Sequence, residues 1–397
     1  MKLERIRLKN FKTFQNAEMS NIPAFCIIVG ANGSGKTSFF DVFGFLKDCL
    51  NDNVTKALRN RGGYHEVVSR GHDDEPILIE LQYRTKINRR DRLVSYLLEI
   101  GLNEARKPCV SREILRYKRG SHGSPFHFLD YTNGIGSAII NEEDFDKTDE
   151  DLHRETNPLK NCDILAIKGL GQFQKFKAAN ELREFIENWH VSDFHINQAR
   201  GLKENNGYDE HLSETGDNLQ LVAKYIQDNH PDVFQKILDR MCACVPGVSR
   251  IETENTSDNR LLLKFHNGKF VDPFIDRYVS DGTIKMFAYL ILLHDPVPHP
   301  FLCIEEPENQ LYPSLLLELA EEFRNYAHRG GQVFVSTHSP DFLNDAELDE
   351  VFWLEKLDSG FTKISRAAND EQIAIYMREG DKMGYLWKQG FFNGVDP

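Results

Sequence analysis

The sequence predicts an α/β fold in which a parallel core sheet carries an antiparallel β lobe and a helical insertion. Three patterns support this class. Residues 25–29 (FCIIV) form a short, wholly apolar run, typical of a buried parallel strand, and a glycine-rich loop and a helical stretch follow it. Between residues 77 and 140, strand-like segments alternate with breaks rich in Gly, Asn and Asp. Helical periodicity then dominates from about residue 174 to residue 245.

The remaining elements follow from changes of periodicity along the chain. In the first part we expect a strand at 3–8, a turn at 10–14, the strand at 25–29, a helix at 37–50, and strands at 77–84, 93–102, 110–117 and 126–131. In the last part we expect a hairpin at 250–270, a helix at 282–294, a strand at 301–304, a helix at 313–327, a strand at 332–336, a hairpin at 351–364 and a final helix. We therefore divide the single unit 1–397 into an N-terminal part (1–140), a helical insertion (141–250) that opens with an acidic connector, and a C-terminal lobe (251–397).

The composition and charge of the chain limit which kinds of molecule it can bind. The chain has 397 residues, 40% hydrophobic and 27% charged, which is a globular composition, and its formal net charge is −13. Nucleic acid repels such a chain on average, so DNA contact needs a local basic patch. Residues 84–119 offer one, with eleven Lys/Arg against four Asp/Glu, or +7. Because these charges alternate with apolar residues along expected strands, a solvated sheet face is favoured over a DNA site.

Cysteine usage and hydropathy indicate the compartment. The longest apolar run, at 286–293, falls far short of the ~20 residues that span a bilayer, and the N-terminus carries no signal-peptide core. No CxxC pair or zinc spacing occurs among the cysteines. We expect a soluble, cytoplasmic protein with no membrane contact and seven reduced thiols: Cys26, Cys49, Cys109, Cys162, Cys242, Cys244 and Cys303.

A phosphate-binding motif follows the strand at 25–29. Residues 30–37 (GANGSGKT) match GxxxxGK[ST] between a strand and a helix, the context that this motif requires. Its glycines let backbone N–H groups surround an anion, and the helix N-terminus adds a positive dipole end. Lys36 is expected to bridge the β- and γ-phosphates of a nucleotide, and the Thr37 hydroxyl to ligate Mg²⁺. The expected ATP-binding residues here are Gly30, Asn32, Gly33, Ser34, Gly35, Lys36, Thr37 and Ser38.

Two adjacent carboxylates end the strand at 301–304. Since neighbouring strand residues point to opposite sides, Glu305 and Glu306 can divide two tasks. We expect Glu305 to hold the Mg²⁺ and Glu306 to act as general base on the attacking water. The alternative, a solvated Glu-Glu-Pro-Glu turn, is disfavoured by the phosphate-binding motif upstream.

Three further motifs narrow the subclass. Residues 280–283 (SDGT) precede a mostly apolar helix; they form an ordinary N-cap, but Gly282 also leaves helix amides open to an anion. Residues 307–313 (PENQLYP) follow the glutamates, and His338 stands just after the strand at 332–336. A lone histidine is usually structural, whereas at this location it has the reach of a γ-phosphate sensor.

Together these motifs resemble the ABC-type ATPase heads of the SMC, RecF and OLD-nuclease class. The resemblance covers nearly the whole chain and is closest to stand-alone bacterial ATPases that often belong to phage-defence or toxin–antitoxin-like operons. The matching segments are 11–14 (the "NF-x-x-F" opening), 280–283 (the signature motif), 305–309 ("DEPE-N"), His338 (the switch histidine), and the segments 189–200 and 216–219.

The resemblance implies a head-to-tail homodimer, or a higher even oligomer, with two composite sites. In each site Ser280 and Gly282 of one copy would close over the ATP held by Lys36 of the other. The implied catalytic residues are Lys36, Glu306 and His338, and the implied cofactors are ATP and Mg²⁺.

Two departures from the family pattern affect this interpretation. The family usually has Asp where this chain has Glu305, which suggests slow turnover. The family's Q-loop glutamine has no clear counterpart, and Gln172 and Gln174 are the candidates.

Three biological roles stay open. The favoured one is a defence ATPase that senses an infection-linked signal and controls a separately encoded effector such as a nuclease. The OLD class fuses a TOPRIM nuclease after the switch histidine, and only 59 residues follow His338, with no DxD pair. The alternatives are a DNA repair ATPase that clamps DNA, with salt-sensitive binding lost on neutralising Arg89, Arg90 and Arg92, and an ATP-gated scaffold with little turnover.

Overall fold

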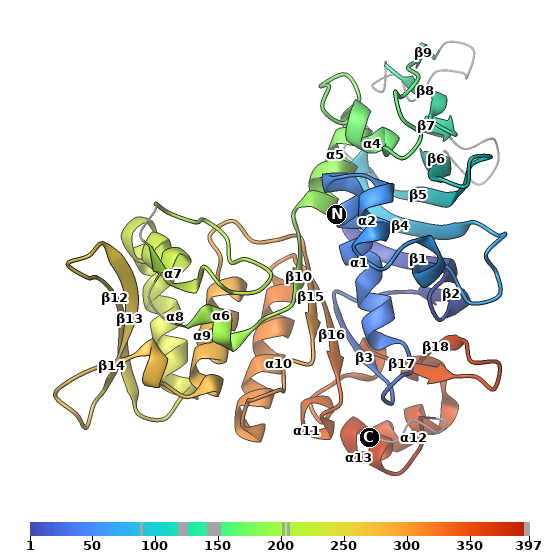
Figure 1. Cartoon of the computed structure of the whole chain (residues 1–397). Helices are drawn as coiled ribbons and strands as arrows, with labels where there is room; N and C mark the ends of the chain where they lie inside the picture. The colour runs from blue at the N-terminus through green and yellow to red at the C-terminus, as the bar shows by residue number, and fades with distance from the viewer. Residues whose placement is uncertain (88–89, 118–125, 141–151, 201–202, 205–206, 393–397) are drawn as a thin grey trace.

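The molecule is L-shaped, with the core sheet at the corner of two arms (Figure 1). The computed structural model describes residues 1–87, 90–117, 126–140, 152–200, 203–204 and 207–392. One arm carries an antiparallel sheet and the other carries helices α7 to α9 with a small sheet (Figure 1).

The core sheet has six strands in the order β10-β15-β16-β3-β17-β18. The first five are parallel and β18 is antiparallel to β17. Alternate residues of β3 enter different hydrophobic clusters, Cys26 and Ile28 on one face and Phe25, Ile27 and Val29 on the other. A strand buried on both faces needs this continuous apolar run. The strands are β10 (Trp189–Ser192), β15 (Phe301–Glu305), β16 (Gln332–Thr337), β3 (Phe25–Val29), β17 (Val351–Lys356) and β18 (Thr362–Arg366).

The expected antiparallel lobe is confirmed as an eight-stranded sheet, and it includes the N-terminal hairpin. Its order is β2 (Phe14–Ser20), β1 (Lys2–Phe11), β4 (Ile77–Ile87), β5 (Arg90–Leu102), β6 (Pro108–Tyr117), β7 (Phe126–Thr132), β8 (Ile135–Ile139) and β9 (Arg154–Thr156). One hydrophobic cluster joins this sheet to α1 and to one face of the core sheet. The helices on this side are α1 (Lys36–Asn51), α2 (Val54–Arg59), α3 (Tyr64–Val67), α4 (Ala166–Leu170) and α5 (Lys177–Glu187).

A second cluster packs helices against the opposite face of the core sheet. These helices are α6 (Ile196–Ala199), α7 (Leu219–Asn229), α8 (Pro231–Cys244), α9 (Asp281–Leu293), α10 (Pro313–His328), α11 (Pro340–Leu343), α12 (Glu371–Glu379) and α13 (Met383–Lys388). A small sheet caps the arm with β11 (Lys203–Glu204), β13 (Arg260–Asn267), β12 (Val248–Asn255) and β14 (Phe274–Ile275). The expected hairpin at 250–270 is β12 and β13.

One strand of the core sheet lies between residues 174 and 245, where helical periodicity dominates the sequence. β10 pairs in parallel with β15, with Trp189 opposite Phe301 and Ser192 opposite Ile304. The sequence analysis, in which helical periodicity dominates this segment, missed the strand because four residues are too few to establish a period of their own. Helices α4 and α5 pack with the antiparallel sheet, whereas α7 and α8 pack in the other arm. The domain boundaries at 140 and 250 stay a prediction.

The expectation of seven reduced thiols is wrong for one pair. Cys109 of β6 and Cys162 form a disulfide with their Cα atoms 5.1 Å apart. The backbone brings the two segments together, because Val110 N donates to Cys162 O at 2.7 Å. Because the two cysteines are 53 residues apart, the sequence alone does not reveal that they pair.

A buried carboxyl in the antiparallel sheet is expected to make stability depend on pH. Glu113 is fully buried and accepts hydrogen bonds from Ile167 N at 3.0 Å, from the Tyr96 hydroxyl at 3.1 Å and from Ala166 N. Burial raises the pKa of Glu113 from 4.5 to about 7. Between these two values the folded state holds a proton that the unfolded state has lost, so stability falls as pH rises.

The expected loss between pH 5 and pH 8 is about 3 kcal/mol. Urea unfolding of the wild type and of Glu113→Gln at both pH values measures it. The variant should lack this part of the decrease. Equal decreases in the two proteins would show that Glu113 does not titrate in this range.

Candidate active site

The glycine-rich loop joins β3 to α1 in a conformation that only small residues permit. Gly33 and Gly35 have φ angles of 78° and 107°, in the left-handed region. A Cβ on Gly35 would lie 2.8 Å from the Thr13 and Thr362 hydroxyls, and one on Gly30 would lie 2.8 Å from Leu354 O. The loop is therefore packed against β17 and β18 on its outer side. Asn32 and Gly33 are exposed at its tip, and Ser38 lies in the first turn of α1.

Lys36 is folded back onto the loop that precedes it. Its Nζ donates to Gly30 O at 2.7 Å and to Ala31 O at 3.2 Å. Burial lowers the pKa of Lys36, and the negative charges of Glu306, Glu308 and Glu305 oppose that shift. A bound polyphosphate would offer the Lys36 ammonium an anionic hydrogen-bond partner in place of these two carbonyls. The buried Ser34 hydroxyl likewise has no hydrogen-bond partner among the described residues.

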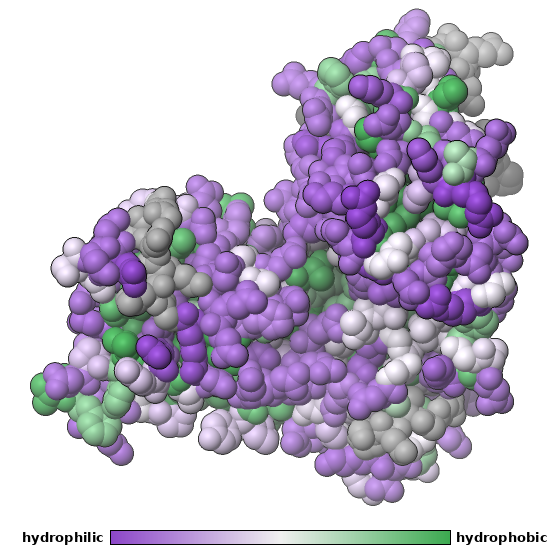
Figure 2. Space-filling view, in the orientation of Figure 1, coloured by the Kyte–Doolittle hydropathy of each residue, from purple (hydrophilic) through white to green (hydrophobic). Residues whose placement is uncertain are grey.

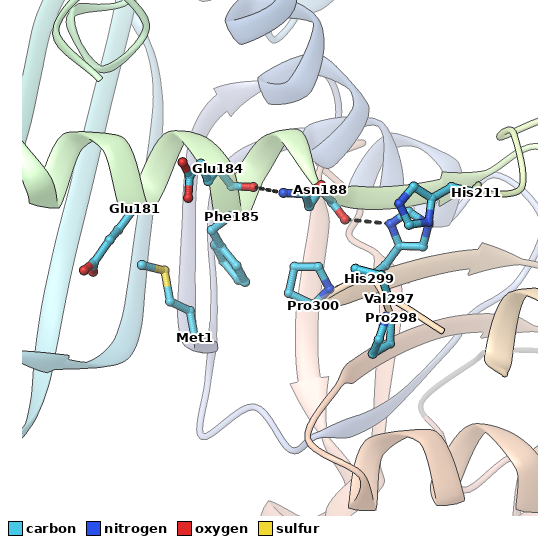
Figure 3. Close-up of a pocket in the computed structure, with 10 residues that line it drawn as sticks. All are labelled: Met1, Glu181, Glu184, Phe185, Asn188, His211, Val297, Pro298, His299 and Pro300. Carbon is cyan, nitrogen blue, oxygen red and sulfur yellow. Dashed lines mark hydrogen bonds between the residues drawn. The ribbon is translucent and has the colours of Figure 1, made fainter. Parts of the chain in front are cut away.

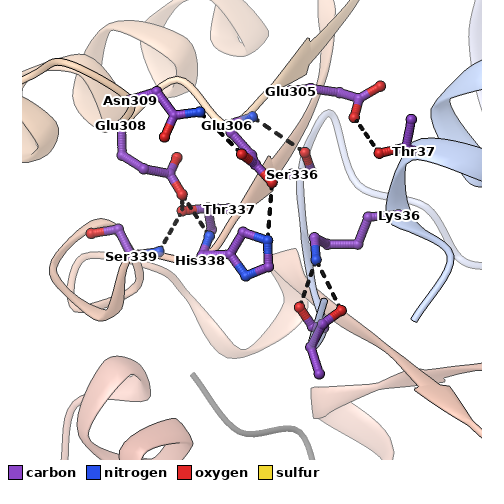
Figure 4. A network of polar contacts seen from close by, with 12 residues as sticks. Lys36, Thr37, Glu305, Glu306, Glu308, Asn309, Ser336, Thr337, His338 and Ser339 are labelled. Atoms are coloured by element: carbon purple, nitrogen blue, oxygen red, sulfur yellow. Dashed lines mark hydrogen bonds and ion pairs between the residues drawn. The ribbon is translucent and has the colours of Figure 1, made fainter. Parts of the chain in front are cut away.

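Thr37 of the phosphate-binding motif lies in contact with Glu305, the other residue that we expect to hold Mg²⁺. Thr37 Oγ1 donates to Glu305 Oε2 at 3.0 Å (Figure 4). Burial raises the pKa of Glu305, and repulsion by Glu306, Asp193 and Asp41 adds to that shift. A hydroxyl and a carboxylate are ligands that Mg²⁺ prefers, and a cation would relieve the repulsion. These residues fit a Mg²⁺ ion.

Glu306 lies at the centre of a polar network. His338 Nε2 lies 3.0 Å from Glu306 Oε1, and Asn309 Nδ2 donates to Oε2 at 3.0 Å (Figure 4). The backbone of Glu306 has a φ of 44°, and its N–H donates to Ser336 O at 3.0 Å. The residue therefore lies in a left-handed turn just past β15, with its carboxylate held on both oxygens. This arrangement suits a general base whose orientation matters.

Two further residues shape this turn. Glu308 Oε1 accepts from Thr337 Oγ1 at 2.8 Å and from His338 N at 2.5 Å, which ties the turn to the end of β16. Lys285 of α9 donates to Asn309 O at 2.8 Å. Burial lowers the pKa of Lys285 to about 8. The sequence analysis missed Lys285, although it is the one charged residue in the apolar stretch 284–293.

The signature segment is held by a residue from a distant part of the chain. Ser280 caps α9, with its Oγ accepting from Thr283 N at 3.3 Å. Arg200 pairs with Asp281 and donates to Val279 O at 2.6 Å. A Cβ on Gly282 would lie 2.8 Å from Gln310 O, so α9 begins against the turn that follows Glu306.

The structure does not bring the signature segment to the phosphate-binding loop of the same chain. Within the described ranges, no hydrogen bond or ion pair joins residues 280–283 to residues 30–37. Tyr278, two residues before Ser280, is 72% exposed. Ser280 is exposed as well, whereas Gly282 and Thr283 are buried within the chain.

The segment after β10 lies on one side of β15, the strand that ends in Glu305. Asp193 follows β10 directly, and its charge contributes to the raised pKa of Glu305. Gln172 and Gln174 lie exposed ahead of α5. Asp193 thus follows the strand that pairs with β15, and the position of the Q-loop glutamine stays a prediction.

Three arginines of the basic stretch 84–119 make contacts with neighbouring strands. Arg84 pairs with Glu4 at 2.5 Å, Arg112 pairs with Asp130 at 3.2 Å, and Arg92 lies 5.9 Å from the centroid of the Tyr117 ring. These contacts agree with a solvated sheet face. Arg89 lies outside the described residues.

Over the described parts of the chain, no helix combines the length and the apolar character that crossing a membrane requires.

Comparison with known proteins agrees with this geometry. Residues 1–219 match a family model described as "AAA ATPase domain", and residues 169–344 match one described as "AAA domain, putative AbiEii toxin, Type IV TA system". The chain is 24% identical over 145 residues to the DNA replication and repair protein RecF of Lactococcus lactis, covering 35% of this chain and 40% of the relative. It is 24% identical over 193 residues to the DNA double-strand break repair Rad50 ATPase of Saccharolobus solfataricus, covering 46% of this chain and 20% of the relative.

The fold resembles that of a solved SMC head. The crystal structure of an SMC head bound to the C-terminal winged-helix domain of ScpA superposes with a TM-score of 0.54, at 14% identity, over 95% of this chain and 100% of that chain. The predicted head-like α/β fold, with a parallel core and antiparallel strands, is confirmed. The chain spans less than half the length of the curated relatives that it matches.

Proposed function

The chain belongs to the AAA ATPase domain family, in its SMC/RecF-like branch of ABC-type P-loop ATPases, and from this premise we propose that two copies hydrolyse ATP in composite sites and so control a separately encoded effector in antiphage defence. The observation that carries the catalytic part is the network around Glu306. His338 and Asn309 hold its two carboxylate oxygens, close to the Thr37–Glu305 pair.

The residues divide the work as follows. The loop amides and Lys36 would bind the phosphates, and Thr37 and Glu305 would hold a Mg²⁺ ion that would supply positive charge to them. Glu306 would accept a proton from the attacking water, and His338 would orient Glu306 through their 3.0 Å contact and act as the γ-phosphate sensor. The longer side chain of Glu305, where the family usually has Asp, is expected to slow turnover.

A second copy supplies the missing donors. Its Ser280 hydroxyl and the first amides of its α9 would close over the γ-phosphate with a positive dipole end. Exposed apolar side chains precede this segment along the chain, namely Phe270, Val271, Phe274 and Tyr278. Figure 2 shows apolar residues at the end of the arm that carries β14. Such exposed residues favour a role for this end in protein contacts.

The defence role rests on the match to a model whose description names a toxin and a type IV TA system. The test is a phage plating assay with the gene in its native operon, comparing the wild type with Lys36→Ala. We expect the variant to lose protection while its protein accumulates normally. Absence of protection by the wild type would contradict the defence role, and equal protection by both proteins would contradict its dependence on ATP. ATP binding without measurable turnover in the wild type would favour the scaffold instead.

A DNA-clamping role is the second candidate, because RecF and Rad50 are among the relatives. Arg92, Arg106 and Lys107 lie on β5 and the turn after it. Neutralising these three should remove salt-sensitive binding to duplex DNA if that role is correct. A charge-matched control neutralises three residues of the C-terminal helices, Arg378, Lys382 and Lys388.

A further inference from the structure

A cluster of histidines lies at the end of the core sheet opposite to Glu305. Asp295 follows α9 by two residues, and His299 precedes β15 by two residues. His211 approaches from the segment that precedes α7. Figure 3 shows His211 and His299 side by side at one end of a pocket of about 310 Å³. This cluster has no part in the ATP site described above.

The three side chains converge closely enough to share one ion. One nitrogen of each histidine and one carboxylate oxygen of Asp295 lie within 4.8 Å of one another. The two imidazole rings have their centroids 5.1 Å apart. The Asp295 side chain is only 3% exposed, and His211 Nδ1 lies 2.7 Å from its Oδ2.

His299 has the hydrogen-bond pattern of a metal ligand. Its Nδ1 lies 2.9 Å from Asn188 O, and because a carbonyl only accepts, Nδ1 carries the proton (Figure 3). Nε2 therefore presents a lone pair, yet it is buried and has no hydrogen-bond partner among the described residues. Leaving a buried polar atom unsatisfied costs roughly 1–3 kcal/mol. Histidines that ligate metals commonly donate their other N–H to a backbone carbonyl in this way.

The orientation of His211 also follows from its polar neighbour. Its Nδ1 lies 2.7 Å from Asp295 Oδ2, so an ion bound by both residues would take the place of the proton between these two atoms.

We propose that His299, His211 and Asp295 bind a first-row transition-metal ion, with Zn²⁺ as the best match. Two imidazoles and one carboxylate form a three-ligand set that leaves one tetrahedral position open, here on the side of the pocket. Zn–N bonds of ~2.0–2.1 Å put tetrahedral donors ~3.3 Å apart, so His211 Nδ1 would move slightly away from Asp295 Oδ2 while the distances of up to 4.8 Å within the cluster shorten. His211, 38% exposed, lies outside any helix or strand and supplies that movement.

A bound ion would join the two parts of the chain that lead into the active site. Asp295 follows the helix that begins at the signature segment, and His299 leads into the strand that ends at Glu305. The site does not depend on the proposed function, since its ligands touch neither the phosphate-binding loop nor Glu306.

The test is metal binding to the full chain after treatment with a chelator and desalting. Competition with a chromophoric zinc chelator should give one Zn²⁺ per chain for the wild type. We expect His211→Ala and His299→Asn each to weaken this binding at least tenfold. Co²⁺ in place of Zn²⁺ should give the weak visible bands of a nitrogen and oxygen site. The half-exposed position of His211 makes its variant the safer one for folding.

The matched control is His65→Ala. His65 Nδ1 lies 2.6 Å from Asp73 Oδ1, the same histidine–aspartate contact as in the cluster. This variant should bind Zn²⁺ like the wild type. Equal Zn²⁺ affinity in His211→Ala, His299→Asn and the wild type would overturn the proposal. So would a thiolate-to-cobalt charge-transfer band, which would place the ion on cysteines.

Discussion

Glu306→Gln is expected to lower ATP turnover at least a hundredfold while ATP still binds. The amide keeps the size of the side chain but cannot accept a proton from water, and general-base catalysis contributes about 10²–10⁴-fold. Lys36, Thr37 and Glu305 do not depend on this proton transfer, so nucleotide affinity should change little. Steady-state phosphate release and equilibrium ATP binding measure the two effects separately.

The control is Glu321→Gln, which changes an exposed glutamate on α10 in the same chemical way. It should retain wild-type turnover. If Glu306→Gln also kept wild-type turnover, Glu306 would not be the base, and the contact with His338 at 3.0 Å would be structural only.

Mixing two inactive variants is expected to restore ATP turnover. Lys36→Ala removes the phosphate-binding cation, and Ser280→Arg places a bulky side chain at the start of α9. If each site combines Lys36 of one copy with Ser280 of the other, each variant alone is inactive. In a random mixture half of the dimers are mixed, and each mixed dimer has one intact site of two. The mixture should therefore reach about a quarter of wild-type turnover.

The control for folding is Ser257→Arg, in the exposed turn between β12 and β13 of the same arm. It should hydrolyse ATP like the wild type. A mixture as inactive as its two components would mean that Ser280 and Lys36 do not complete each other's sites across the dimer.

The catalytic motifs could be predicted because short, contiguous segments carry their geometry. The loop at 30–37 needs only its glycines, the apolar strand before it and the helix after it. The contact between Thr37 and Glu305 and the approach of His338 to Glu306 follow from parallel strands that end at one edge of the sheet.

The missed features depend on distant residues. β10 becomes a strand because β15 pairs with it, and four residues such as WHVS carry no period of their own. Cys109 meets Cys162 through a backbone contact that spacing does not reveal. Phe11 and Phe14, which belong to the segment that resembles the family's opening motif, are fully buried against α1, because β1 and β2 pack over that helix. His211 and His299 are 88 residues apart and come together only in the folded chain.

The most direct test of the composite site is the mass of Glu306→Gln by light scattering, with and without Mg-ATP. The account predicts a rise from about 45.8 kDa to twice that value on adding Mg-ATP, because the variant binds ATP and cannot hydrolyse it. Lys36→Ala and Ser280→Arg, each combined with Glu306→Gln, should abolish the rise. A mass that stays at that of one chain with saturating ATP would contradict the sandwich dimer.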